Sequence, residues 1–301
     1  MQRTSNPYKD FIESFQLFAS RNPKLIINTL SNIFSMRIIG NKTHGDLAEI
    51  GISEFINQFI YDYESMHVGK DLFRSKEHEE DIVIKCLKGY GKGEAIPISL
   101  KAYGVGPLQL STDKEFILFR FLASKVEDGH LNSKAEIDKI LCSKEFESIK
   151  NLNILPMIYN EKEYKCNMMV FDSEKAFEAV ARIDLVQARQ KFDEETGEIT
   201  VDRNKKCRLY PIYRFSDAHN KYLFEVRYGG ANANALQRGF WTHTLNCDNK
   251  FFTSITNGWI DYSENRDLVK MISLALVSTQ KAHQDASTIL QKDIDVQKLP
   301  R

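Results

Sequence analysis

Apolar residues recur at helical spacing through the first part of the chain and alternate at strand spacing through much of the rest. The spacing predicts helices over 10–19, 24–38 and 43–63, then 133–142 and, near the end, 266–282. Asn6 and Asn22 each precede a proline, a pair typical of an N-cap followed by the first helical residue. Strands are predicted over 154–160, 164–171, 197–201, 207–215 and 221–228, whereas the period of 107–123 leaves strand and helix open.

The third predicted helix has one apolar side, which indicates the face that it buries. Steps of about 100° per residue place Glu49 at the border of this side, whereas Glu54 points nearly away from it. Glu49 is therefore the acid on this helix that we expect beside a buried sheet. The apolar side consists of Ala48, Ile52, Phe55, Ile56 and Phe59.

The apolar pattern of residues 79–101 predicts two short strands joined by a turn rich in glycine and lysine. If the turn is centred on Gly91, antiparallel pairing places Asp81 directly opposite Lys101. Side chains alternate between the two faces of a strand, so Ser99 shares the face of Lys101 and Asp81. A carboxylate, a hydroxyl and an amine on one face suit the binding of a divalent metal and the activation of a water.

A metal-dependent phosphodiesterase needs carboxylates for the metal and profits from a lysine that orients the attacking water. Asp81 and Lys101 can supply both functions, while Ser99 stands where a second acid would be most useful. A second carboxylate must then come from elsewhere, and Glu49, Glu79 and Glu80 are the alternatives. The competing interpretation is that Asp81 and Lys101 form an ordinary cross-strand surface pair.

A second group of polar residues surrounds the double glycine at 229–230. Arginine pairs with guanine, and asparagine or glutamine with adenine, so these residues are candidates for DNA contact. The alternative is a plain strand, turn and helix with a buried Trp241. The candidates are Arg227, Asn232, Asn234, Gln237, Arg238 and His243.

Composition is that of an ordinary globular protein, with 301 residues, 42% hydrophobic and 27% charged. Lysines plus arginines and aspartates plus glutamates are 41 each, so net charge does not indicate a general polyanion binder. The five cysteines form no CxxC pair, which favours a reduced intracellular protein, and no apolar run has the length of a membrane span. Helices followed by a strand-rich half predict a mixed α+β, or α/β, fold with a central mixed β-sheet flanked by helices. We expect one domain over 1–301, with helices and the hairpin in 1–150 and a strand-rich, DNA-contacting half plus a C-terminal helix in 151–301.

The pattern Asp81, then Ser99-Leu100-Lys101, resembles the core of the PD-(D/E)xK nucleases, and among them the type II restriction endonucleases. The segments 98–114 and 224–244 are also similar to segments of bacterial restriction enzymes. The chain departs from the pattern because Glu80 replaces the usual proline and Ser99 the usual second acid. Members of this superfamily can recruit a displaced acid from a helix, a role for which Glu49 is the candidate.

The resemblance implies a cytoplasmic bacterial enzyme that cuts double-stranded DNA with Mg²⁺ at a specific site. Asp81 and Glu49 would bind the metal, Ser99 would assist, and Lys101 would orient the water. The resemblance further implies a homodimer and, as genetic partner, a cognate DNA methyltransferase. Two other hypotheses stay open: a non-catalytic nucleic-acid-binding protein on a decayed nuclease core, and a nuclease of repair or of RNA.

Overall fold

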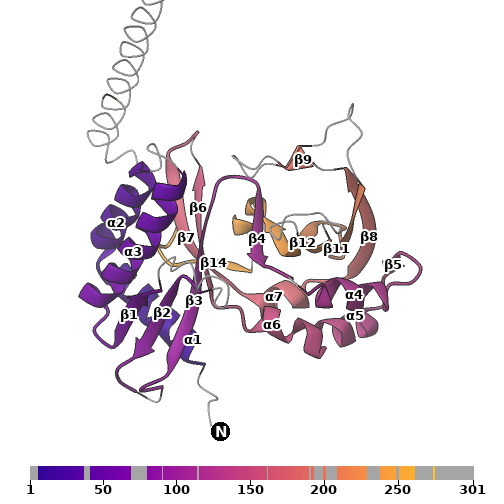
Figure 1. The fold of residues 1–301 in the computed structure, drawn as a ribbon, viewed down its shortest axis with the longest axis horizontal. Helices are drawn as coiled ribbons and strands as arrows, with labels where there is room; N and C mark the ends of the chain where they lie inside the picture. Colours follow the sequence, from indigo (N-terminus) through magenta and orange to yellow (C-terminus); the bar gives the residue numbers. More distant parts are fainter. Residues whose placement is uncertain are drawn as a thin grey trace, which may run out of the picture.

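The fold is that of a computed structural model, in which two β-sheets and their helices form successive layers (Figure 1). The structure describes residues 6–36, 41–68, 80–89, 91–113, 115–160, 162–189, 191–192, 199–200, 209–228, 238–248, 251–261 and 274. One hydrophobic core lies between the N-terminal helices and the first sheet, and a second joins the first sheet to the second. The predicted mixed α/β class is confirmed, but two sheets replace the single central sheet that we expected.

Three helices cover one face of the first sheet: α1 (Pro7–Arg21), α2 (Pro23–Ser35) and α3 (Asn41–Phe59). The N-cap predicted at Asn6 is confirmed, because its side chain accepts hydrogen bonds from the backbone N–H of Tyr8 and Lys9. Asn22 makes no such cap, since its amide instead donates to the carbonyl of Phe18 at 3.3 Å. The proline that follows still begins α2, as its fixed φ favours the first helical turn.

The first sheet has the order β1-β2-β3-β6-β7-β14, with β15 also paired to β7. Among the described strands of this sheet, β3 and β6 are the pair that runs parallel, and the chain between them passes through the second sheet. Strand β6 is buried on both sides, because Leu155 and Met157 face the helices while Ile154 and Ile158 face the second core. The strands are β1 (Tyr63–His67), β2 (Ile82–Cys86), β3 (Ala95–Tyr103), β6 (Ile154–Asn160), β7 (Lys165–Phe171), β14 (Phe252–Ser254) and β15 (Ile260–Asp261).

The second sheet is antiparallel, with the order β4-β13-β12-β11-β8-β5, and short helices pack beside it (Figure 1). Residues 107–123, whose period was ambiguous, divide into a strand of this sheet and then a helix. The strands are β4 (Pro107–Ser111), β5 (His130–Leu131), β8 (Arg182–Arg189), β11 (Leu209–Ser216), β12 (Tyr222–Arg227) and β13 (Gly239–His243), while β9 (Lys191–Phe192) and β10 (Ile199–Thr200) pair separately. The helices are α4 (Ile117–Ala123), α5 (Lys134–Leu141), α6 (Glu147–Lys150) and α7 (Ser173–Glu178), with 3₁₀ turns η3 (Lys144–Phe146) and η5 (Thr244–Asp248).

The predicted C-terminal helix, 266–282, lies outside the described residues apart from Leu274, which is helical. Across the described ranges, none of the helices combines the length and apolar character needed to cross a membrane.

Candidate active site

The hairpin of β2 and β3 is present, but its register differs from the predicted one. Ile82 lies opposite Ile98 and Lys85 opposite Ala95, so Ser99, and not Lys101, follows as the residue facing Asp81. The turn explains the shift, because Gly93 donates to the Cys86 carbonyl at 2.9 Å and Cys86 donates to that of Glu94 at 3.0 Å. The turn is therefore centred one residue earlier than Gly91. Gly93, with φ of 89°, adopts the left-handed backbone that such a turn requires.

Asp81 nevertheless meets both Ser99 and Lys101 through its side chain. Its Oδ2 accepts hydrogen bonds from the Ser99 hydroxyl at 3.0 Å and from the Leu100 backbone N–H at 2.6 Å. The Lys101 Nζ lies 3.9 Å from the same oxygen. Strand β2 begins at Ile82, so the backbone hydrogen bonds between β2 and β3 end near Asp81. The Asp81 carboxylate therefore accepts the hydrogen bond from the Leu100 N–H in place of a backbone carbonyl.

This group faces the second sheet and not the N-terminal helices. Ser99 lies beside Ile154 in the parallel pair of β3 and β6, and Ile154 belongs to the second core. Leu100, between Ser99 and Lys101, points the other way into the first core. The side chains of Asp81 and Lys101 are partly open, with 23% and 34% of their surfaces exposed. A phosphate group can thus approach them from solvent.

Glu49 lies on the opposite face of the first sheet. Its predicted place on α3 is confirmed, since Ala48 and Ile52 are buried, Glu49 is half-buried and Glu54 is exposed. Its Oε2 lies 2.9 Å from Nε2 of His67, whose strand position pairs with the helix-facing Ile82. Among the described residues Glu49 forms no hydrogen bond with Asp81, and the two acids do not gather with His67 in an arrangement that could hold a metal ion.

Other sources for a second metal-binding carboxylate are limited within the described part of the chain. Glu80 directly precedes Asp81, whereas Glu79 lies outside the described residues. Across the described ranges, no three histidine, cysteine or acidic side chains gather in an arrangement that could hold a metal ion. Among the contacts of the described residues, the possible oxygen ligands that meet at the hairpin are the Asp81 carboxylate and the Ser99 hydroxyl. Within these ranges Asp81 Oδ1 accepts no hydrogen bond, which leaves this oxygen for a hard cation.

The second predicted group is only partly visible. Arg227 is 9% exposed; its Nε donates to the Glu225 carboxylate, and its guanidinium lies 4.3 Å from the centre of the Trp241 ring. Arg227 therefore has its partners inside the protein. Trp241 is buried, as the alternative interpretation predicted. Asn232, Asn234 and Gln237 lie outside the described residues.

Arg238 immediately precedes strand β13, and His243 is the last residue of that strand. The Arg238 guanidinium lies 4.1 Å from the centre of the Phe116 ring. His243 Nδ1 accepts a hydrogen bond from the backbone N–H of Leu245 at 3.1 Å. Burial, with the Arg227 charge nearby, lowers the pKa of His243. Sequence spacing did not predict that Phe116 contacts Arg238 or that His67 contacts Glu49, because the tertiary fold brings each pair together.

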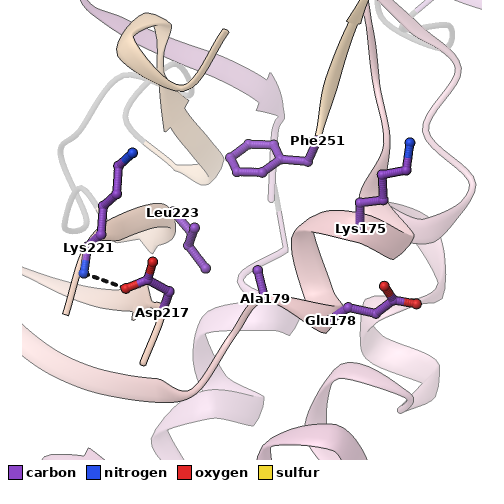
Figure 2. Close-up of a pocket in the computed structure, with 7 residues that line it drawn as sticks. All are labelled: Lys175, Glu178, Ala179, Asp217, Lys221, Leu223 and Phe251. Atoms are coloured by element: carbon purple, nitrogen blue, oxygen red, sulfur yellow. Dashed lines mark hydrogen bonds between the residues drawn. The ribbon is translucent and has the colours of Figure 1, made fainter. Parts of the chain in front are cut away.

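A hollow of about 730 Å³ lies apart from these groups, between α7 and the turn that joins β11 to β12 (Figure 2). Lys175 and Lys221 stand on opposite sides, with Phe251, Leu223 and Ala179 between them. Asp217 serves its own turn, since its carboxylate accepts from the N–H groups of His219 and Lys221. Lys175 is paired with Asp172 at 3.3 Å. The hollow therefore has charged side chains at its edge, and none of the residues that line it forms a contact between a nucleophile and a base.

Neither the protein-family models nor the curated proteins contain a match to this chain.

Proposed function

We propose that the chain is a Mg²⁺-dependent type II endodeoxyribonuclease that hydrolyses double-stranded DNA at a specific site. The observation that carries this proposal is the convergence of Asp81, Ser99 and Lys101 on one partly exposed face of the first sheet. The negative Asp81 carboxylate suits a metal cation, and the positive Lys101 ammonium group beside it suits a phosphodiester. The Leu100 N–H and the Ser99 hydroxyl hold the carboxylate in place.

Asp81 would hold the cation through Oδ1, while its Oδ2 keeps the hydrogen bonds from Leu100 and Ser99 that fix the carboxylate. A Mg²⁺ ion held by Asp81 would neutralise charge at the phosphate and make a nearby water more acidic. Lys101 orients the attacking water and stabilises the negative charge that develops on the phosphate oxygens. Attack by the water oxygen forms one P–O bond and breaks another, and the proton of the water passes to solvent or to the leaving oxygen.

One protein carboxylate is compatible with this role. Mg²⁺ commonly keeps several waters and binds through one or two carboxylates together with phosphate oxygens of the substrate. In this proposal the scissile phosphate takes the place that a second acid would fill, while Glu49 stays with His67 on the helical face. DNA and metal then bind cooperatively, since each completes the site of the other.

The proposal includes a homodimer, because a two-fold protein matches a two-fold DNA site. It also includes a DNA methyltransferase as genetic partner, which would protect the host DNA from cleavage. Arg238, just before β13, and His243, at its end, are the described candidates for DNA contact from the second sheet.

A non-catalytic DNA-binding protein is the second candidate function. The observation that favours it is that the described residues gather no group of three metal-binding side chains, and that Glu49 is paired with His67 on the helical face. Such a protein would bind DNA through the same faces without cutting it.

One cleavage experiment separates these functions. Phage DNA is incubated with the protein in Mg²⁺ and in EDTA, beside Lys101→Ala and the control Lys85→Ala, an exposed lysine on the same face of the neighbouring strand. The proposal predicts discrete fragments that disappear with EDTA and with Lys101→Ala but persist with Lys85→Ala. Binding without cleavage would support the non-catalytic function. Ragged degradation, or cleavage of RNA alone, would indicate a nuclease of another class.

A further inference from the structure

Arg214, within β11, lies on the side of the second sheet that faces away from the second core. Both of its neighbours along the strand, Tyr213 and Phe215, belong to that core, and side chains alternate between the two faces of a strand. On β12, Glu225 and Arg227 also alternate with core residues, so they share the side of Arg214. Helices α4 to α7 contribute to the second core and therefore cover the opposite side (Figure 1). We call the side that carries Arg214, Glu225 and Arg227 the outer face of the second sheet.

Two acids lie directly opposite Arg214 on the outer face, one on each neighbouring strand. They are Asp184 on β8 and Glu225 on β12. Opposite charges in such positions commonly pair across the strands. Here each acid instead accepts from an arginine two residues away on its own strand, Asp184 from Arg182 Nε at 2.6 Å and Glu225 from Arg227 Nε. Within the described part of the chain, Arg214 forms an ion pair with neither acid.

The guanidinium of Arg214 also has no hydrogen-bond acceptor among the residues that the structure describes. Arg214 is half-buried, and its Nε is buried without a partner. The guanidinium carbon lies 5.8 Å from the centre of the Tyr222 ring, and the Tyr222 hydroxyl donates to Glu225, which engages that acid a second time. A partly buried charge without a counter-charge lowers the free energy of unfolding. Arg214 is thus destabilising, unlike Arg182 and Arg227, whose charges are neutralised.

Positive charge is in excess within this group of side chains. The group contains three arginines and two acids, which leaves one positive charge. Trp241 adds a further donor, because it lies opposite Glu225 on β13 and its buried Nε1 has no hydrogen-bond partner. A ligand that complements the group is an anion that only accepts hydrogen bonds, as a phosphodiester does. Arginine forms strong charge-assisted hydrogen bonds with phosphate.

We propose that Arg214 contacts a backbone phosphate of bound duplex DNA, a contact for which its charge is left without a partner in the protein. The inference rests on the proposed function, since it takes double-stranded DNA as the ligand. A phosphate contact adds the same affinity on every sequence and increases the salt dependence of binding, because counterions leave the DNA. Arg214 was not among the predicted DNA contacts, because its lack of a partner follows from the pairing of β8, β11 and β12 in the folded protein.

The test measures the binding of short duplexes of several sequences in EDTA, so that cleavage does not interfere, over a range of salt concentrations. Arg214→Gln removes the charge, Arg214→Lys keeps it, and Arg21→Gln removes an exposed arginine at the end of α1 as the matched control. We expect Arg214→Gln to bind every sequence about tenfold more weakly, with a slope of log K against log salt that is shallower by about one. Arg214→Lys and Arg21→Gln should keep the wild-type slope.

Thermal unfolding of the protein without DNA gives a second readout. Because the Arg214 charge has no counter-charge among the described residues, Arg214→Gln should leave the Tm unchanged or raise it. A lower Tm with an unchanged salt slope would make Arg214 a structural residue and overturn the inference.

The remaining outcomes separate the inference from the proposed function. Duplex binding by the wild type, with the same affinity and slope in Arg214→Gln, overturns the inference alone. Loss of preference at one base position with an unchanged slope would make Arg214 a base contact and also overturn it. A wild type that binds no duplex DNA contradicts both proposals. In that case, inorganic phosphate that raises the Tm of the wild type but not of Arg214→Gln would assign the site to a small phosphate compound.

Discussion

Replacing Ser99 with aspartate should convert the incomplete metal site into a stronger one. The Ser99 hydroxyl lies 3.0 Å from Asp81 Oδ2, so the new carboxylate would stand next to the existing one. At a separation of about 4 Å and an effective dielectric constant of about 20, two like charges repel by about 4 kcal/mol. Lys101, 3.9 Å from Asp81 Oδ2, offsets part of this repulsion. Without a divalent cation we expect Ser99→Asp to lower the free energy of unfolding by about 1–3 kcal/mol.

Mg²⁺ should reverse this loss, because a cation held by two carboxylates binds more tightly than one held by a single carboxylate. A concentration of about 100 times Kd adds about 2.7 kcal/mol to the free energy of unfolding. For a chain of 301 residues that corresponds to a rise in Tm of about 4 °C. The assay is thermal unfolding with and without Mg²⁺ for the wild type, Ser99→Asp and Ser99→Asn, the last being the isosteric control without the charge. If Mg²⁺ raises the Tm of Ser99→Asp no more than that of Ser99→Asn, the placement of a metal at Asp81 is refuted.

Three further predictions concern groups around this site. Tyr8→Phe removes the buried hydrogen bond from the Tyr8 hydroxyl to the Ile154 carbonyl, 2.8 Å long, and should lower the free energy of unfolding in urea by about 1 kcal/mol; no change would contradict this. Glu49→Gln should leave cleavage nearly intact, since Glu49 contacts His67 on the opposite face; loss of cleavage would restore Glu49 as a metal ligand. Burial lowers the pKa of His243 from its ordinary value of 6.5, so its contribution to stability is present above that value and is lost as the pH falls through the lower folded pKa. The Tm should therefore fall more between about pH 7.5 and 5.5 in the wild type than in His243→Gln, and equal slopes would show that another group is responsible.

The three N-terminal helices could be predicted from the sequence, because apolar residues recur along each of them at helical spacing. Asn6 and Pro7 marked where α1 begins, and the arc of Ala48, Ile52 and Phe55 gave the buried side of α3. Local spacing was sufficient here, since the pattern depends only on residues three or four positions apart.

The hairpin could be predicted as an element but not in its register. Composition alone does not say which glycine takes the left-handed conformation, and a shift of the turn centre moves every pair along the strands. The shared face of Asp81, Ser99 and Lys101 survives the shift, because the alternation of side chains is the same in both registers. The sequence could not show on which side of the sheet Glu49 lies, because that depends on which face α3 covers in the folded protein.

The second sheet shows a limit of another kind. Strand β4 follows the hairpin directly but pairs with β13, which is distant in the sequence. No local signal indicates such a partner, and the same is true of the contact between Phe116 and Arg238. Both arise from non-local pairing, so they were not predicted.

Binding of a divalent cation tests the central claim most directly. Mn²⁺, which reports its own binding by electron paramagnetic resonance, is titrated into the protein with duplex DNA present, for the wild type, Asp81→Asn and Lys85→Ala. We expect a saturable site in the wild type and in Lys85→Ala that disappears in Asp81→Asn, because the Asp81 carboxylate is the proposed protein ligand. Equal Mn²⁺ binding by Asp81→Asn and the wild type would show that Asp81 does not hold the cation.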